Sequence, residues 1–229
     1  KLPLTMAALS QSPVIGVFSH IGFQDAADGA SHQATTYFAA TSAIPHTVVI
    51  ALSCADEAEA LIYQAIKRIN DDRSKGEVGE SVIFFLGREN YPVHYLDDAS
   101  YEWGKAQVLR EGKDVTLVTH GSLVGKALEA ADQLEAKGKS ATVINNAFIN
   151  RPDLETIGAS VKATGHLVTM EDHQIICGLG QQLVSALVNE GIAFKARNLG
   201  IDGEFGQSAY MADHLYDKHG LNAEGFIKA

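Results

Sequence analysis

Short apolar runs alternate with amphipathic stretches along the whole chain, a pattern typical of layered α/β proteins with mainly parallel sheets. In the first 92 residues, runs of β-branched and aromatic side chains predict three strands, and helical periods predict two helices. The strands are Val14–Phe18, Thr47–Leu52 and Ser81–Leu86, and the helices are His32–Thr41 and a segment from about Glu57 to Asn70. We expect this first unit to be incomplete, because it resembles only the second part of an α/β domain.

The second half of the chain repeats the alternation four times. The predicted strands are Val115–Thr119, Ala141–Asn145, His166–Met170 and Phe194–Leu199, and the predicted helices are Leu123–Ala136, Asp153–Lys162, Leu179–Asn189 and Ala209–His219. Between the halves, Pro92–Gly112 is polar and has no clean period, which indicates a connector. We therefore predict two consecutive parallel-sheet α/β units, an incomplete one at residues 1–92 and a small complete one at 114–229, with a linker at 93–113.

Composition and charge restrict the partners. The chain has 28 Asp and Glu against 18 Lys and Arg, a formal net charge of −10, and no Lys/Arg cluster, so we expect no nucleic-acid partner. No apolar run approaches the roughly 18 to 20 residues that span a bilayer, so we expect no membrane association. Cys54 and Cys177 lie far apart and form no CxxC pair, which favours free buried thiols and a cytoplasmic location.

The densest polar cluster lies between a predicted strand and a predicted helix, at residues 19–33. Open α/β sheets bind ligands at that edge, outside the carboxyl ends of their strands. The loop contains two histidines, His20 and His32, and two aspartates, Asp25 and Asp28, which could orient hydroxyl groups and transfer protons. The alternative is a surface loop whose Asp and Ser side chains cap the following helix.

Arg88 follows another predicted strand, Ser81–Leu86. A guanidinium at the carboxyl end of a strand is well placed to hold a phosphate or carboxylate with two parallel hydrogen bonds. The alternative is a structural ion pair with Glu89 or another neighbouring carboxylate.

Five stretches together resemble the transketolase family. His20 and His32 are twelve residues apart with Asp28-Gly29 between them, which is similar to the family motif H-D-S-x-G-x-G-E-D-G-P-T-H-Q. Ala27, Ala30 and Ser31 depart from the Glu, Pro and Thr of that motif. The other similar stretches are Ala39–His46, Leu86–Pro92, Gly104–Val118 and Val168–Leu183, the last resembling transketolases encoded as two sections. The resemblance covers nearly all of residues 13–225.

The resemblance implies a fold and a set of roles. Residues 1–92 would form part of a pyrimidine-binding domain, and 114–229 a transketolase C-terminal domain. The family moves a two-carbon ketol unit between sugar phosphates with thiamine diphosphate. His32 is then the expected catalytic residue, in contact with the C1 hydroxyl and carbonyl region of the donor sugar. Asp28 would read the C2 hydroxyl, and His20 and Arg88 would bind the phosphate of the acceptor.

The resemblance also implies missing parts. In the family, the glutamate that activates the aminopyrimidine precedes the His20 motif, and the diphosphate and Mg²⁺ bind to a separate preceding domain. The chain begins with Lys1 rather than Met, so we expect a processed chain or a piece of a longer one. We expect it to bind no cofactor or metal alone, to be inactive alone, to need an N-terminal section, and to form a homodimer.

Other functions stay open at this point. The 1-deoxyxylulose-5-phosphate synthases share the D-G-x-T-H motif and the arginine, but typically lack a histidine at the position of His20. The dehydrogenase β-type subunits have a histidine motif without the Asp-Gly pair. The remaining alternative is a non-catalytic α/β subunit or interaction module that keeps only the fold.

Overall fold

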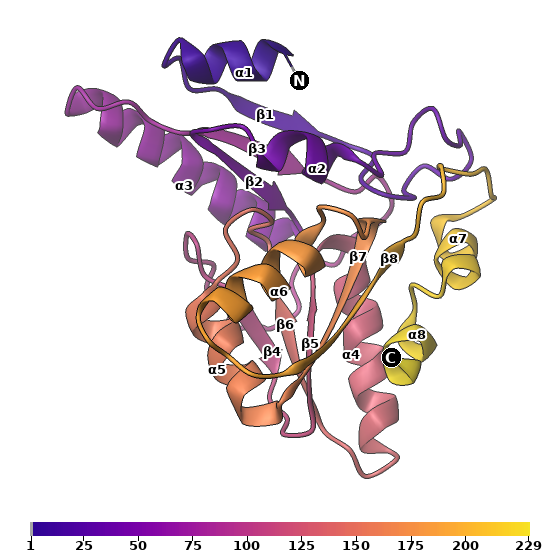
Figure 1. Cartoon of the computed structure of the whole chain (residues 1–229). Coiled ribbons are helices and arrows are strands. Elements are labelled where there is room, and N and C mark those ends of the chain that lie inside the picture. The colour runs from indigo at the N-terminus through magenta and orange to yellow at the C-terminus, as the bar shows by residue number, and fades with distance from the viewer. Residues whose placement is uncertain (1) are drawn as a thin grey trace.

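Two separate β-sheets, each with its own helices, make up residues 2–229, which the computed structural model describes (Figure 1). The first sheet has the order β1-β3-β2 and is wholly parallel. Its strands are β1 (Ile15–Phe18), β2 (Thr47–Ala51) and β3 (Ser81–Phe85). β2 and β3 are buried along their whole length, because apolar side chains alternate onto both faces of the sheet.

Helices cover both faces of the first sheet. They are α1 (Leu2–Leu9), α2 (Tyr37–Ser42) and α3 (Ala55–Ser74). Phe38 of α2 packs in the same apolar cluster as Ile83, whereas Leu61 of α3 packs in the cluster that contains Phe84. α2 begins five residues later than predicted, because Ala34 instead pairs with Ile21 in an isolated bridge.

The second sheet has the order β4-β6-β5-β7-β8. Its parallel strands are β5 (Val115–Thr119), β6 (Ala141–Asn145), β7 (His166–Gln174) and β8 (Lys195–Ile201). β4 (Gln107–Arg110) runs antiparallel to β6 at the edge. The sequence pattern missed β4, because only Leu109 of its four residues is buried and so no strand period is visible. The expectation of two α/β units rather than one continuous sheet is confirmed.

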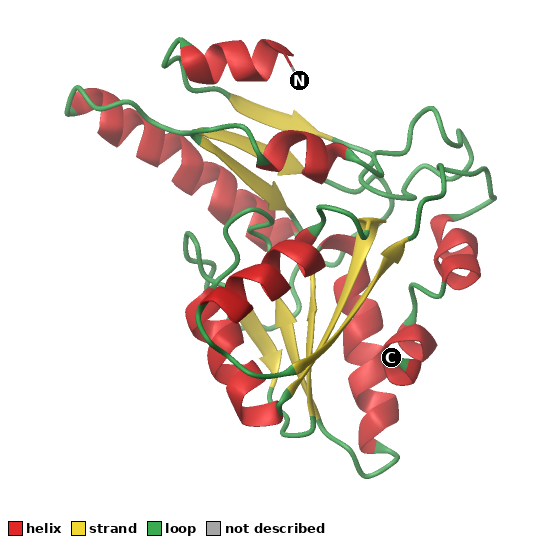
Figure 2. Cartoon of the chain, in the orientation of Figure 1, coloured by secondary structure: helices red, strands yellow, loops and turns green. Residues whose placement is uncertain are grey.

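The second sheet is also covered on both faces (Figures 1 and 2). Leu117 packs in the cluster that contains the apolar residues of α4, and its neighbour Val118 packs in the cluster that contains those of α5 and α6. The helices of this unit are η1 (Gly121–Leu123), α4 (Val124–Glu135), α5 (Leu154–Thr164), α6 (Leu179–Asn189), α7 (Ala212–His219) and α8 (Ala223–Lys228). None of the helices within residues 2–229 is long and apolar enough to cross a membrane.

The two units share a core where the second meets β2. The Ala51 N–H donates to the carbonyl of Ala147 at 2.9 Å, and the Ile149 N–H donates to the carbonyl of Val49 at 2.8 Å, so residues 147–149 lie antiparallel beside β2. Nearby, the buried carboxylate of Glu57 accepts hydrogen bonds from Ser53 and Asn145. The two units are therefore joined by backbone pairing as well as by apolar contact.

The two cysteines differ in exposure. Cys54 is buried, as expected, but Cys177 is exposed, so the expectation of two buried thiols is wrong for the second. Cys177 lies in the turn between β7 and α6 with a φ of 58°, outside the apolar layers. Both thiols are free.

Candidate functional site

Two parallel neighbours bring His20 and Arg88 to one sheet edge. β1 pairs with β3 in parallel, with Phe18 opposite Phe85. His20 lies two positions after the end of β1, and Arg88 lies three positions after the end of β3. The Ile21 N–H donates to the carbonyl of Leu86 at 3.2 Å, which continues the pairing into the loops. The geometry expected for these two residues from the alternation of strands and helices is therefore present.

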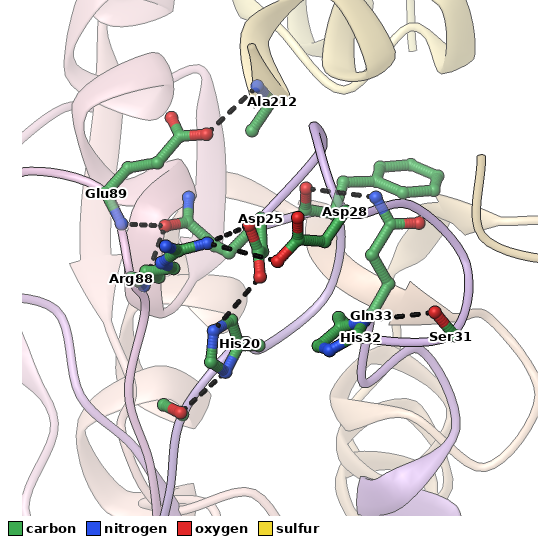
Figure 3. A network of polar contacts seen from close by, with 12 residues as sticks. His20, Asp25, Asp28, Ser31, His32, Gln33, Arg88, Glu89 and Ala212 are labelled. Atoms are coloured by element: carbon green, nitrogen blue, oxygen red, sulfur yellow. Dashed lines mark hydrogen bonds and ion pairs between the residues drawn. The ribbon is translucent and has the colours of Figure 1, made fainter. Parts of the chain in front are cut away.

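Asp25 lies at the centre of the site (Figure 3). Its side chain is only 3% exposed and forms an ion pair with Nη1 of Arg88. Its other oxygen, Oδ2, is 3.2 Å from Nε2 of His20. Nη1 of Arg88 also lies 3.7 Å from Oδ2 of Asp28. The site is thus a compact group of two cations or potential cations and two carboxylates.

The sequence assigned no specific role to Asp25, although the loop that holds it was singled out. The only signal was its position between the two histidines, which says nothing about burial. The sequence leaves open a structural ion pair of Arg88 with Glu89 or another neighbouring carboxylate, and the carboxylate that Arg88 meets is Asp25. The side chain of Glu89 instead accepts a hydrogen bond from the Ala212 N–H at 3.1 Å.

Arg88 keeps binding capacity despite its ion pairs. Its side chain is 53% exposed, and within residues 2–229 its side-chain contacts to carboxylates are made by Nη1. A guanidinium has five N–H donors in a planar fork, so Nη2 and Nε can still donate to an anion. Asp25 then orients the guanidinium, and the rest of the half-exposed fork stays open to solvent.

His32 lies on the same edge. It is exposed, and its ring centroid is 6.3 Å from that of His20, with the rings edge to face. Each ring is oriented by the preceding serine: Oγ of Ser19 is 2.6 Å from Nδ1 of His20, and Oγ of Ser31 is 3.0 Å from Nδ1 of His32. His20, Asp28, His32 and Arg88 therefore come together at one edge (Figure 3).

The loop stores backbone strain where it carries these groups. His20 and Asp25 have φ values of 65° and 64°, a region that side chains other than glycine occupy at a cost of roughly 1 to 2 kcal/mol each. Gly22 has a φ of 58°, and a Cβ there would lie 1.8 Å from Cγ of Asp172. Such a conformation persists only where surrounding contacts hold it.

The buried carboxylates of the described chain are already occupied. Asp172 accepts from the Phe23 N–H and from the Tyr216 hydroxyl, and Glu171 accepts from the N–H groups of Leu179 and Gly180. Burial raises the pKa of Glu171 to about 8 and that of Asp172 to about 7. Glu57 is bonded as described above.

The buried carboxylates of residues 2–229 do not fit the role of a free partner for an aminopyrimidine nitrogen. Each buried carboxylate accepts from the chain's own donors, so none is free for a cofactor nitrogen. Residues 2–229 also contain no group of three or more His, Cys, Asp or Glu side chains that could hold a metal ion.

The fold and the site define a class of protein: two α/β units, one with a parallel and one with a mostly parallel sheet, joined by backbone pairing, with a cluster of polar side chains at the carboxyl edge of the smaller sheet. The family model for the transketolase pyrimidine-binding domain matches residues 3–93, and that for the transketolase C-terminal domain matches residues 104–225. The chain belongs to this transketolase family of thiamine diphosphate-dependent proteins.

Relatives carry different names. The chain is 33% identical over 214 residues to a Methanocaldococcus jannaschii protein that bears the name transketolase C-terminal section, and the match covers 93% of this chain and 63% of that protein. It is 31% identical to the 1-deoxy-D-xylulose-5-phosphate synthase of Heliobacterium modesticaldum, over 96% of this chain and 32% of the synthase. The chain thus spans less than two thirds of the length of these relatives.

A solved structure shares the whole architecture. A split-gene transketolase, described as an inactive β4 tetramer, superposes with a TM-score of 0.80 at 30% identity. The match covers 98% of this chain and 72% of that one.

Proposed function

We propose that this chain is the substrate-binding section of a transketolase that moves a two-carbon ketol unit between sugar phosphates. The observation that carries the proposal is the grouping of His20, Asp28, His32 and Arg88 around the buried Asp25. A guanidinium beside an imidazole suits the phosphate of a sugar. A carboxylate beside a second imidazole suits its hydroxyl groups. In this proposal Arg88 and His20 bind the acceptor phosphate, Asp28 reads the C2 hydroxyl, and His32 contacts the reacting end of the donor.

The proposed enzyme needs a second polypeptide section. Because the buried carboxylates already accept hydrogen bonds and residues 2–229 contain no group of three or more His, Cys, Asp or Glu that could hold a metal ion, the groups that hold thiamine diphosphate and Mg²⁺ are proposed to come from that section. The similarity to proteins named as split or sectional transketolases supports this division. The chain alone is then expected to show no tight cofactor binding and no ketol transfer.

The apolar surface near β1 supports association with another chain. Val17 and Phe18 of β1 are 51% and 40% exposed, and Leu2 and Leu9 of α1 are 70% and 73% exposed. Such a surface on a soluble chain favours a protein interface. We propose that self-association or the N-terminal section covers it, and light scattering of the chain with and without that section tests this.

The activity test uses the chain assembled with its N-terminal section. Transfer of a two-carbon ketol unit from a ketose phosphate such as xylulose 5-phosphate to an aldose phosphate is the expected reaction. The alternative of 1-deoxyxylulose-5-phosphate synthase is favoured by the match to such a synthase over nearly the whole chain. It predicts instead condensation of pyruvate with glyceraldehyde 3-phosphate. The presence of His20 favours the transketolase reaction, and product analysis by mass spectrometry separates the two.

Arg88→Ala tests the phosphate contact in that assembled enzyme. We expect KM for phosphorylated acceptors to rise about 10- to 100-fold, because a charge-assisted contact is worth about 1.5 to 3 kcal/mol. KM for unphosphorylated acceptors should change little. Arg151→Ala is the matched control, since Arg151 forms an exposed ion pair with Glu80 far from the site. An equal rise in KM for both kinds of acceptor contradicts the assignment.

Asp28→Ala tests recognition of the C2 hydroxyl. We expect the variant to lose discrimination between C2 epimers of the acceptor, because the penalty for an unpaired polar group disappears. Asp56→Ala is the control, because Asp56 pairs with His94 elsewhere on the surface. Unchanged epimer selectivity, measured as a ratio of kcat/KM values, argues against this role.

A further inference from the structure

Two glutamines bracket the loop that carries the site. Gln24 precedes Asp25, and Gln33 follows His32. Gln24 is 3% exposed, and its Oε1 accepts from the N–H groups of Arg88 at 3.1 Å and Glu89 at 2.7 Å. One amide oxygen therefore holds the loop after β3 against the loop after β1.

The other end of the Gln24 amide reaches the second unit. Its Nε2 donates to the hydroxyl of Tyr216 in α7 at 3.1 Å. Tyr216 in turn donates to the buried carboxylate of Asp172 at the end of β7. Asp172 also accepts from the Phe23 N–H at 2.9 Å, one residue before Gln24. The start of the site loop is thus bonded to both α7 and β7.

Gln33 makes a similar connection at the other end of the loop. Its Nε2 donates to the carbonyl of Gln207 at 2.9 Å, and its Oε1 accepts from the N–H of the same residue at 2.8 Å. Gln207 lies between β8 and α7. The side-chain amide of Gln33 therefore bonds to both the N–H and the carbonyl of Gln207, as the backbone of a neighbouring strand would.

The middle of the loop packs on the same segment of the second unit. The Ala209 N–H donates to the carbonyl of Ala26 at 2.9 Å. Gly29 lies so close to Ser208 that an added Cβ would be 2.3 Å from its Oγ. In Figure 1 the site loop and the segment before α7 lie side by side.

We propose that Gln24 and Gln33 are positioning residues through which the second unit holds the site loop in its binding geometry. The substrate that the loop holds rests on the proposed function, whereas the positioning itself does not. The strained φ values of His20 and Asp25 need such support, because an unsupported loop relaxes to commoner conformations. The second unit therefore contributes to the site through the hydrogen bonds that hold the loop.

Hydrogen–deuterium exchange of the full chain tests the proposal. The variants are Gln24→Ala and Gln33→Ala, with Gln64→Ala as the matched control, since Nε2 of Gln64 donates to the Tyr101 carbonyl at 2.7 Å away from the site. We expect amides of residues 20–34 to exchange about 10-fold faster in the first two variants, a local loss of about 1.4 kcal/mol of protection. Amides of β5 and β7 should be unchanged. Gln24→Glu keeps an acceptor for the Arg88 and Glu89 amides but loses the donor to Tyr216, so it should lose protection as Gln24→Ala does.

Two exchange results overturn the proposal. Unchanged exchange in residues 20–34 shows that the glutamines do not hold the loop. An equal increase throughout the chain shows that they serve only general stability.

Activity in the assembled enzyme gives a second readout. We expect Gln33→Ala to lower kcat/KM about 10-fold while Gln64→Ala does not, and unchanged kcat/KM despite faster exchange also overturns the proposal. If the wild-type assembly transfers no ketol unit, the proposed function fails, and the exchange experiment alone still decides the positioning.

Discussion

The two units of this protein differ in how completely they bury their sheets. The second unit covers a five-stranded sheet on both faces. The first unit has three strands; Val17 and Phe18 of β1 are exposed, and α1 has no buried residue. Yet the cluster of His20, Asp25 and Arg88 lies on the smaller unit. The smaller unit presents the polar groups, and in our proposal the larger one supports the loop that carries them.

The units also differ in how they use polar side chains. In the second unit, Glu171, Asp172 and His173 are each no more than 1% exposed, and each accepts or donates hydrogen bonds within the chain. In the first unit, Asp28 and Arg88 are each 53% exposed. Buried polar groups that are fully paired stabilise one arrangement, whereas exposed ones remain available to a ligand. The contrast predicts where substitutions destabilise the chain and where they do not.

The largest expected effect lies in the core of the second sheet. Leu117→Ala removes a fully buried side chain of β5 and should lower the free energy of unfolding by about 3 kcal/mol. Urea denaturation followed by circular dichroism measures the change. A loss below about 1 kcal/mol would show that this sheet is not the stable part of the molecule.

The second-largest expected loss of stability is at Asp25, a buried carboxylate of the first unit. Asp25→Ala removes the buried carboxylate that pairs with Arg88 and His20 and should cost about 2 kcal/mol. Arg88→Ala alone and the double variant complete a thermodynamic cycle. Strictly additive losses in that cycle would mean that the ion pair does not contribute to folding.

The pH dependence of stability tests the buried histidine of the second unit. Burial lowers the pKa of His120 to about 3, and its ring nitrogens have no hydrogen-bond partner in the described chain. Below about pH 6.5 the unfolded chain binds a proton that the folded chain does not, so stability falls as the pH falls toward 3. His120→Leu should remove this loss and gain about 2 kcal/mol at pH 5 relative to pH 8.

The exposed His166 supplies the control for that measurement. His166→Leu should leave the pH dependence of unfolding unchanged. If both variants behave alike, burial of His120 is not the cause of acid sensitivity.

Glu171 and Asp172 have the opposite effect on the pH dependence of stability. Burial raises their pKa values, so their stabilising contribution is lost as the pH rises through about 7 to 8.

The smallest expected effect is at the exposed strand of the first unit. Val17→Thr keeps the shape of a side chain that is 51% exposed and should change the free energy of unfolding by less than about 0.5 kcal/mol. The same variant should weaken association with a second chain, as measured by analytical ultracentrifugation. A stability loss near that of Leu117→Ala would erase the difference between the two units.

Much of the fold could be predicted from local pattern. The central strands β2, β3, β5 and β6 were found because each is a short, nearly continuous apolar run. β4 was missed because a four-residue edge strand with one buried side chain has no visible period. β7 runs on through Glu171, Asp172 and His173, since tertiary burial there overrides their polarity.

The candidate site divides in the same way. The sequence alone predicts that His20 and Arg88 follow strands and that the loop between His20 and His32 holds several ionisable side chains. The burial of Asp25 beside Arg88, 63 residues away, and the pairing of Gln33 with Gln207, 174 residues away, are visible only in the folded chain. Hydrophobic periodicity and turn-forming residues depend on residues close together in the sequence, so the sequence alone predicts the elements that they form. The pairing of a buried carboxylate or amide depends instead on which distant donors the folded layers bring within hydrogen-bonding distance.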